Sequence, residues 1–148
     1  MIITKVYSPG ILNELINKTI LFHNALLEKE KENKNEKIIE EILSTTKNDE
    51  RQIIRNNYKK IFHRPIQEDI ISFLKEKNFF LHNISLNMFD TPFEYDAREL
   101  KKALTININN NNIDENILIV IFCSRPKSDL EIVDLAFKNF FNKIKEKK

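Results

Sequence analysis

The sequence predicts an all-α protein, and two features of its 148 residues support that fold class. Apolar side chains recur through most of the chain at the three- and four-residue spacing of one helix face. Glycine occurs once and proline four times, which argues against tight hairpins and glycine-rich phosphate loops, because both need positive φ angles. Hydrophobic residues make up 41% of the sequence and charged residues 31%, so a core and a well-solvated surface are both expected.

Five helices are expected before Pro92. Their apolar stripes cover residues 11–27, 38–43, 49–62, 65–74 and 79–88. The charged residues 28–34 lie between the first two stripes and predict a helix end followed by a loop. Asn48 or Asp49 can cap the third helix, since either side-chain oxygen accepts a free first-turn amide. Pro65 suits the first turn of the fourth helix, and Pro92 disfavours helical geometry at the residue before it.

Three further helices are expected after Pro92. Their stripes cover residues 95–104, 114–122 and 130–141. The segment 124–126, which ends in a proline, separates the last two helices. The basic tail at 143–148 is predicted to be a solvated helix end, where lysines suit the helix macrodipole.

The segment that begins at Glu36 is repeated in the segment that begins at Glu115, a shift of 79 residues (115 − 36). Across two helices, apolar positions then fall on apolar positions, and the break between the helices also matches. The matching pairs include Ile38 with Ile117, Ile42 with Ile121, Ile54 with Val133, Tyr58 with Phe137 and Phe62 with Phe141. Since an internal repeat indicates a repeat architecture, we expect five helices followed by a second copy of the first three.

Several segments carry a family resemblance. The run Tyr-Asp-Ala-Arg-Glu-Leu-Lys-Lys-Ala-Leu at 95–104 is similar to the opening helix of an annexin repeat. Residues 36–62 resemble the second and third annexin helices, residues 63–70 the corner that follows, and residues 121–125 the matching element of a second repeat. The resemblance covers nearly the whole chain from Ile11. It implies an annexin-like repeat at 1–92 and a partial annexin-like repeat at 93–148.

The resemblance also implies a calcium site, from which this sequence departs. In annexin repeats the loop between the first two helices carries Gly-x-Gly-Thr, and a distant carboxylate follows the fourth helix. Calcium prefers several oxygen ligands, and glycine lets backbone carbonyls turn toward it. The corresponding segments 29–36 and 106–115 contain no glycine, and Phe73 stands in the place of the distant carboxylate.

We therefore expect no metal ion and no cofactor, with residual calcium binding as the alternative. The weak candidate ligands are Asp114, Glu115 and Glu76. The first two are expected instead to serve as a helix N-cap and a first-turn acid.

The first function that the resemblance implies is peripheral association with a phospholipid membrane, with weak or no calcium dependence. The first-to-second and fourth-to-fifth helix loops lie on one side of an annexin repeat. Five lysines would gather there: Lys29, Lys31, Lys34, Lys75 and Lys77. Interleaved glutamates would cancel much of their attraction to an anionic phospholipid surface.

The alternative is a protein–protein interaction module, or a small subunit of a larger assembly, that keeps the annexin fold without membrane binding. A repeat that lacks its last two helices would leave apolar side chains uncovered, and an exposed apolar patch usually marks an interface. The interface candidates are Phe137, Phe140 and Phe141. We accordingly expect a homo-oligomer or a larger protein assembly, and the chain could also be part of a longer protein.

Other classes of chemistry find little support. With a single glycine, no nucleophile elbow, phosphate loop or dinucleotide fingerprint can form, so we expect no enzymatic activity and no catalytic residue. The three histidines lack metal-ligand spacing, and Cys123 is predicted to be a buried structural residue. A net charge of +2 argues against nucleic-acid binding, despite the basic tail. The single cysteine and the lack of a secretory or membrane-spanning segment predict a cytoplasmic protein, peripheral to membranes at most.

Overall fold

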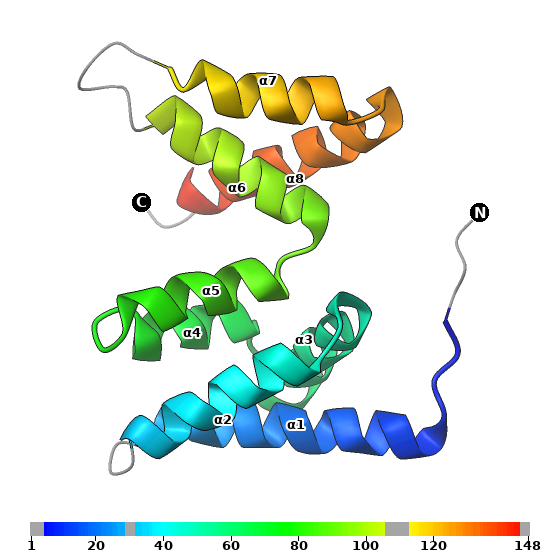
Figure 1. The fold of residues 1–148 in the computed structure, drawn as a ribbon, viewed down its shortest axis with the longest axis vertical. Helices are drawn as coiled ribbons and strands as arrows, with labels where there is room; N and C mark the ends of the chain where they lie inside the picture. Colours follow the sequence, from blue (N-terminus) through cyan, green and yellow to red (C-terminus); the bar gives the residue numbers. More distant parts are fainter. Residues whose placement is uncertain (1–4, 29–31, 106–112, 146–148) are drawn as a thin grey trace. The chain divides into compact units, whose positions relative to one another are not determined.

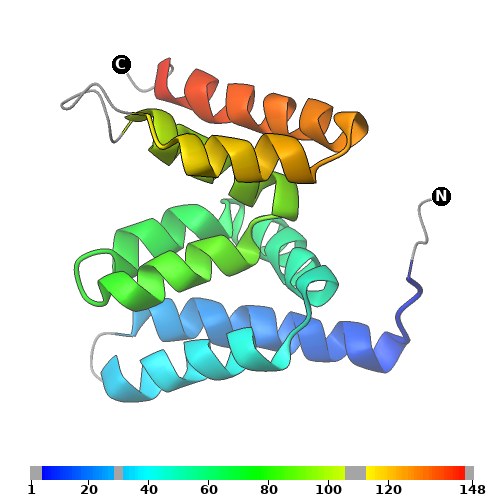
Figure 2. The ribbon, with the colours of Figure 1, turned by 45° about the horizontal axis from the view of Figure 1, so that its top comes forward.

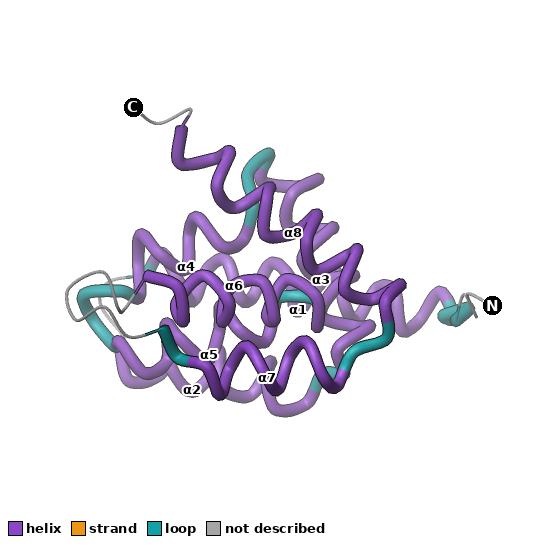
Figure 3. The backbone as a smooth tube through the Cα atoms, turned by 90° about the horizontal axis from the view of Figure 1, so that it is seen from above, coloured by secondary structure: helices purple, strands orange, loops and turns teal. Residues whose placement is uncertain are grey.

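The computed structural model describes residues 5–28, 32–105 and 113–145, and the elements in these ranges are helices joined by short turns (Figure 3). The prediction of an all-α fold is confirmed. The chain divides into two compact units, Met1–Phe89 and Asp90–Lys148. The family resemblance implied a boundary between the two repeats after residue 92, whereas the two compact units separate after residue 89.

The first unit contains five helices (Figure 1). They are α1 (Pro9–Leu27), α2 (Glu32–Thr45), α3 (Asn48–Phe62), α4 (Ile66–Leu74) and α5 (Phe79–Phe89). Helix α1 packs against α2, α3 and α4, while α5 packs against α2, α3 and α4 (Figures 1 and 2). Helix α2 begins well before the predicted stripe at 38–43, because its charged first residues are good helix formers that carry no apolar period.

All five helices contribute to one core. Its largest fully buried apolar side chains are Tyr58, Phe22, Phe89, Leu15, Ile39, Ile54, Ile66 and Ile70. The rings of Phe22 and Phe89 meet edge to face with centroids 5.2 Å apart, an arrangement that aromatic quadrupoles favour. Because Ile66 and Ile70 of α4 are fully buried in this core, the first three helices need α4 as a cover.

Three side chains of α3 also tie that helix to the ends of its neighbours. Arg51 Nε donates to the carbonyl of Met88 at 2.9 Å, and its Nη1 donates to the carbonyl of Thr46. Gln52 and Arg55 donate to the carbonyl of Phe89 at 3.2 and 3.3 Å. The last carbonyls of a helix have no partner within it, so these side chains satisfy groups at the ends of α2 and α5.

The start of α3 differs from the prediction. Neither Asn48 nor Asp49 is the N-cap; the helix begins at Asn48 and its N-cap is Lys47. Glu50 Oε2 accepts the backbone N–H of Lys47 at 2.8 Å, which is one half of a capping box. The helix ends at His63, whose φ of 57° is left-handed, a conformation that histidine adopts more readily than most non-glycine residues.

The second unit contains α6 (Pro92–Thr105), α7 (Glu115–Ser124) and α8 (Lys127–Lys145). Helix α6 packs along both α7 and α8 (Figures 1 and 2). The buried core here is much smaller and comprises Ala97, Leu100, Ile121 and Val133. The described residues therefore form a five-helix unit followed by a three-helix unit, as the internal repeat predicted (Figures 1 and 2).

Helix α6 begins three residues before the predicted start at Tyr95, because a complete capping box precedes it. The Glu94 backbone N–H donates to Thr91 Oγ1 at 3.2 Å, and the Thr91 N–H donates to Glu94 Oε2 at 2.8 Å. Pro92 occupies the first helical position, where its missing N–H removes no helical bond. The proline that ends the preceding segment therefore also starts the next helix.

The helices of the described segments are too short or too polar to span a bilayer.

Replacing Thr91 with alanine should lower the free energy of unfolding by about 1 kcal/mol, because the Glu94 N–H loses its capping partner. Urea unfolding followed by circular dichroism would measure the change. Thr105→Ala, at the exposed opposite end of α6, is the matched control and should alter the free energy by less than about 0.5 kcal/mol. Equal effects of the two substitutions would contradict a specific role for the capping box.

Candidate functional site

The first candidate site is one end of the first unit, where α1 and α4 end and α2 and α5 begin (Figures 1 and 2). We call it the loop end. A depression of about 20 Å³ there brings together residues from three helices and a turn, enough space for about one water molecule. Its lining includes Glu28, Asn35, Glu36, Phe73 and Lys77.

One backbone carbonyl at the loop end already has a side-chain partner. Asn35 is buried, and its Nδ2 donates to the backbone carbonyl of Glu28 at 2.8 Å. That carbonyl directly follows α1 and has no helical partner of its own. The Glu28 carbonyl therefore already accepts a hydrogen bond from the Asn35 amide.

Phe73 is partly buried and packs against the core of the first unit. Sequence analysis expected it in the place of a calcium-binding carboxylate. An aromatic ring offers no oxygen ligand, and calcium needs oxygen ligands. Glu76 lies in the turn after α4 and is exposed.

The predicted lysines are only partly described. Lys34, Lys75 and Lys77 are exposed at the loop end, whereas Lys29 and Lys31 lie outside the described residues. Glu28, Glu36 and Glu76 stand among them. The surface is therefore one of alternating charge rather than a strongly basic patch. 

The second segment that corresponds to a calcium loop of the family, 106–115, is described only from residue 113 onward. Asp114 is the N-cap of α7, and its Oδ1 accepts the Ile117 N–H at 3.4 Å. Glu115 is exposed in the first turn. Within the described ranges, no three His, Cys, Asp or Glu side chains are grouped so that they could hold a metal ion.

Polar side chains of α1, α3 and α4 form a network between these helices of the first unit. This network was not predicted from the sequence. Tyr58 Oη donates to Asp69 Oδ2, and Arg64 Nε lies 3.0 Å from the same oxygen. His23 Nδ1 lies 2.7 Å from Tyr58 Oη. Since the hydroxyl hydrogen goes to Asp69, His23 Nδ1 must be the donor in this second bond. The His23 ring stacks on Phe62, with centroids 3.6 Å apart.

This network changes the ionisation of its members. Burial, followed by the hydrogen bond to Asp69, raises the pKa of Tyr58 well above its ordinary value. Burial lowers the pKa of His23, which the charge of Asp69 opposes and the charge of Arg64 assists. The sequence hinted at such a network only through Tyr58, a hydroxyl within an apolar stripe that needs a partner when buried.

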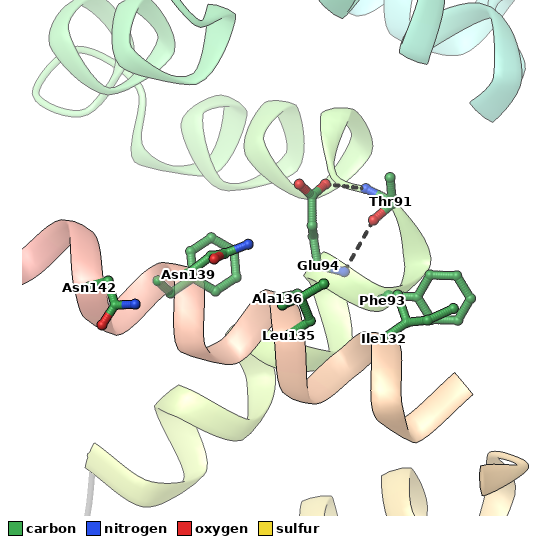
Figure 4. A pocket seen from close by; sticks show the side chains of 9 residues that line it. Thr91, Phe93, Glu94, Ile132, Leu135, Ala136, Asn139 and Asn142 are labelled. Atoms are coloured by element: carbon green, nitrogen blue, oxygen red, sulfur yellow. Dashed lines mark hydrogen bonds between the residues drawn. The ribbon is translucent and has the colours of Figure 1, made fainter. Parts of the chain in front are cut away.

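The second candidate site is the open side of the second unit. Phe137 and Phe140, two of the predicted interface residues, are partly buried against the small core, and the side chain of Phe141 lies outside what the structure describes. A hollow of about 530 Å³ opens beside α8 (Figure 4). Its lining includes Thr91, Phe93, Glu94, Ile132, Leu135 and Phe140. Thr91 and Glu94 bond to each other there, as Figure 4 shows, so their polar groups serve the helix cap.

A more apolar hollow of about 390 Å³ lies among α6, α7 and α8. Its lining includes Leu104, Leu118, Phe122, Leu130, Val133 and Phe137. Two ion pairs stabilise this unit. Arg98 of α6 binds Asp90, just before that helix, through two bonds of 2.8 and 3.0 Å, and Arg125 Nε, which follows α7, binds Asp96 of α6 at 2.7 Å.

The prediction that Cys123 is buried is wrong, since its side chain is exposed. In the register of the internal repeat, Cys123 matches Ser44 of α2, which is also exposed. The apolar run around Cys123 suggested burial, but the position lies on the outward side of the helix in both units.

A five-helix unit followed by a unit that repeats its first three helices defines the class as an all-α protein of annexin-like helical repeats. No protein-family profile matches the chain.

Individual proteins do match it. The chain is similar to Annexin A13 of Canis lupus familiaris, with 35% identity over 108 residues, and to human Annexin A13, with 34% identity over 109 residues. These matches cover 73% and 74% of the chain. Annexin A6 of Gallus gallus is 30% identical over 103 residues, or 70% of the chain. The chain is therefore annexin-like, as its sequence motifs predicted. It spans 32% of the length of the two Annexin A13 proteins and 14% of Annexin A6.

Replacing Tyr58 with phenylalanine should destabilise the protein by about 1–3 kcal/mol, because Asp69 and His23 both lose a buried hydrogen-bond partner. Tyr95→Phe removes an exposed hydroxyl and is the matched control. Chemical unfolding of the two variants beside the parent protein would show the difference. If both substitutions were neutral, the network would contribute nothing to stability.

The lowered pKa of His23 predicts a pH dependence of stability. Its pKa in the folded protein lies below the unfolded value of about 6.5, so the unfolded state binds the proton more readily. Stability should therefore fall as the pH drops through the unfolded pKa toward the folded one, and level off below it. Denaturant midpoints measured across this range would show the fall, and His23→Gln should reduce it. An unchanged pH profile in that variant would exclude His23 as the cause.

Proposed function

We propose that this chain is a non-enzymatic, annexin-like module that associates peripherally with anionic phospholipid surfaces, with weak or no dependence on calcium. The observation that carries the proposal is the loop end, where exposed lysines lie near the bonded carbonyl of Glu28 and near Phe73. At the loop end, Lys34, Lys75 and Lys77 are the described residues that supply the predicted positive charge.

Two contacts support the loss of calcium dependence. The Asn35 amide already binds the carbonyl of Glu28, and Phe73 packs into the core where a carboxylate was expected. A calcium ion at this place would have to displace the first contact and would find no oxygen at the second. The segment 29–36 also contains no glycine that could turn other backbone carbonyls toward a calcium ion.

The charges support a weak attraction to the membrane. A lysine near an anionic bilayer contributes about 1 kcal/mol, and Glu28, Glu36 and Glu76 offset part of the total. A single copy would then bind weakly, and several linked copies would bind much more tightly through their effective concentration. Peripheral binding of this kind needs no membrane-spanning helix.

The second candidate function is a protein–protein interaction module. The open side of the second unit favours it, because an apolar hollow and a set of exposed apolar side chains lie on a small core. Exposed apolar surface of this extent usually marks an interface. The two functions are compatible, since they would use different units of the chain.

Co-sedimentation with vesicles that contain anionic phospholipid would test the membrane proposal. We expect the protein to pellet equally in calcium and in chelator, and less at high salt, because Lys34, Lys75 and Lys77 act through screened charge. The variant Lys34→Glu/Lys75→Glu/Lys77→Glu should lose most of the binding. Lys59→Glu/Lys60→Glu, on the exposed face of α3, is the control and should keep it. Absence of the parent protein from the pellet in every condition would contradict the membrane proposal.

Thermal unfolding in calcium and in chelator would test the loss of the metal site separately. A site that is saturated about a hundredfold above its dissociation constant would add about 2.7 kcal/mol to the free energy of unfolding. We expect no such stabilisation at millimolar calcium. A clear calcium-dependent rise in the melting temperature would show that the loops bind the ion after all.

A further inference from the structure

Helix α7 is apolar on all sides, although it lies at the surface of a three-helix unit. From Ile117 to Cys123 it carries no charged side chain, and Ile121 is the only one of its residues that is buried. Ile119 is 57% exposed, Val120 64% and Phe122 55%. A helix that is hydrophobic all round is normally covered by other parts of a protein.

The internal repeat shows that apolar residues at these exposed positions occur in α7 and not in α2. With the shift of 79 residues, Ile119 and Val120 fall on Glu40 and Glu41 of α2. Those two glutamates are exposed and solvated, as the outward side of a surface helix normally is. The same helical position therefore carries carboxylates in the first unit and aliphatic side chains in the second.

Phe122 differs from its counterpart in another way, since it lines the hollow among α6, α7 and α8 and is still 55% exposed. Its counterpart in α2 is Leu43, which is 3% exposed and belongs to the core of the first unit. We call Ile119 and Val120 the outer face of α7. Since each large side chain of this face would gain free energy by leaving water, the face fits an apolar partner.

The charges at the two ends of α7 indicate which partner. Asp114 and Glu115 stand at its N-terminal end, and Lys127 follows its C-terminal end. Two such helices in antiparallel orientation would bring Glu115 of each copy toward Lys127 of the other. Their macrodipoles would also oppose each other favourably. A parallel pair would instead place like charges together.

We propose that the outer face of α7 is the contact between two copies of this chain, with the two α7 helices antiparallel about a two-fold axis. Such an isologous contact uses the same surface on both copies, so the apolar face covers itself. The proposal does not rest on lipid binding. It does place two loop ends in one particle, which would strengthen any membrane association.

The contact should be weak. Helix α7 has 10 residues and is about 15 Å long at the usual rise per residue. A pair of such helices buries less than the roughly 800 Å² per partner of a standard interface. We therefore expect a dissociation constant of micromolar order or weaker, so that dimers form only as the concentration rises.

Sedimentation equilibrium of the full chain, from about 5 to about 500 µM, tests the proposal. The parent protein should pass from monomer to dimer over this range, and Ile119→Glu/Val120→Glu should remain monomeric. Because α2 carries glutamate at both matching positions, this variant should keep its helical circular dichroism spectrum. The control, Ile71→Glu, alters an exposed apolar residue of α4 and should dimerise as the parent does. A parent protein that stays monomeric throughout, or a dimer that the double substitution leaves intact, would overturn the proposal.

Charge exchange tests the antiparallel orientation. Glu115→Lys and Lys127→Glu should each weaken the dimer by about tenfold, because each turns two attractive contacts into repulsive ones. The combined variant Glu115→Lys/Lys127→Glu should recover the parent affinity, since it restores both contacts with the signs reversed. Additive weakening in the combined variant would overturn the antiparallel arrangement, and higher assemblies than a dimer would overturn the closed two-fold contact.

Discussion

In the first unit, α4 and α5 cover an apolar face that α1, α2 and α3 cannot bury among themselves. Ile66 and Ile70 of α4 are fully buried in that core. The hydroxyl of Tyr58 on α3 donates to the buried carboxylate of Asp69 on α4. A buried carboxylate is tolerable only with such partners. Because α1 packs against α4, residues near the ends of both helices meet at the loop end.

The second unit repeats the first three helices, but its residues differ where the first unit meets α4 and α5. Tyr58 is matched by Phe137, which has no hydroxyl to satisfy. Arg51 and Arg55, which bind the end of α5, are matched by Leu130 and Asp134. The second unit therefore lacks the side chains that make these polar contacts with α4 and α5 in the first unit. The second unit also exposes large apolar side chains, and several of the most exposed ones are on α7.

The two units thus present different kinds of surface. The loop end of the first unit is charged, and the Glu28 carbonyl there is bonded to Asn35, so we expect its contacts with other molecules to depend on salt. The outer face of α7 is apolar and uncharged between its ends, so a partner that covers it would be held by the burial of apolar surface. A protein that combines the two can place several weakly charged surfaces together, which is how individually weak contacts gain strength.

The sequence by itself determined the all-α fold class, the order of the helices and the repeat, because these follow from local periodicity along the chain. It also determined the annexin-like relationship through the order of its motifs. It placed helix ends less well, as at Thr91 and Glu94, because a capping box carries no apolar period. Only the tertiary structure decided that His23, Tyr58 and Asp69 meet, that Asn35 reaches the carbonyl of Glu28, and that Cys123 faces outward. Each of these depends on how helices distant in sequence pack against one another, and a one-dimensional pattern of apolar residues does not contain that information.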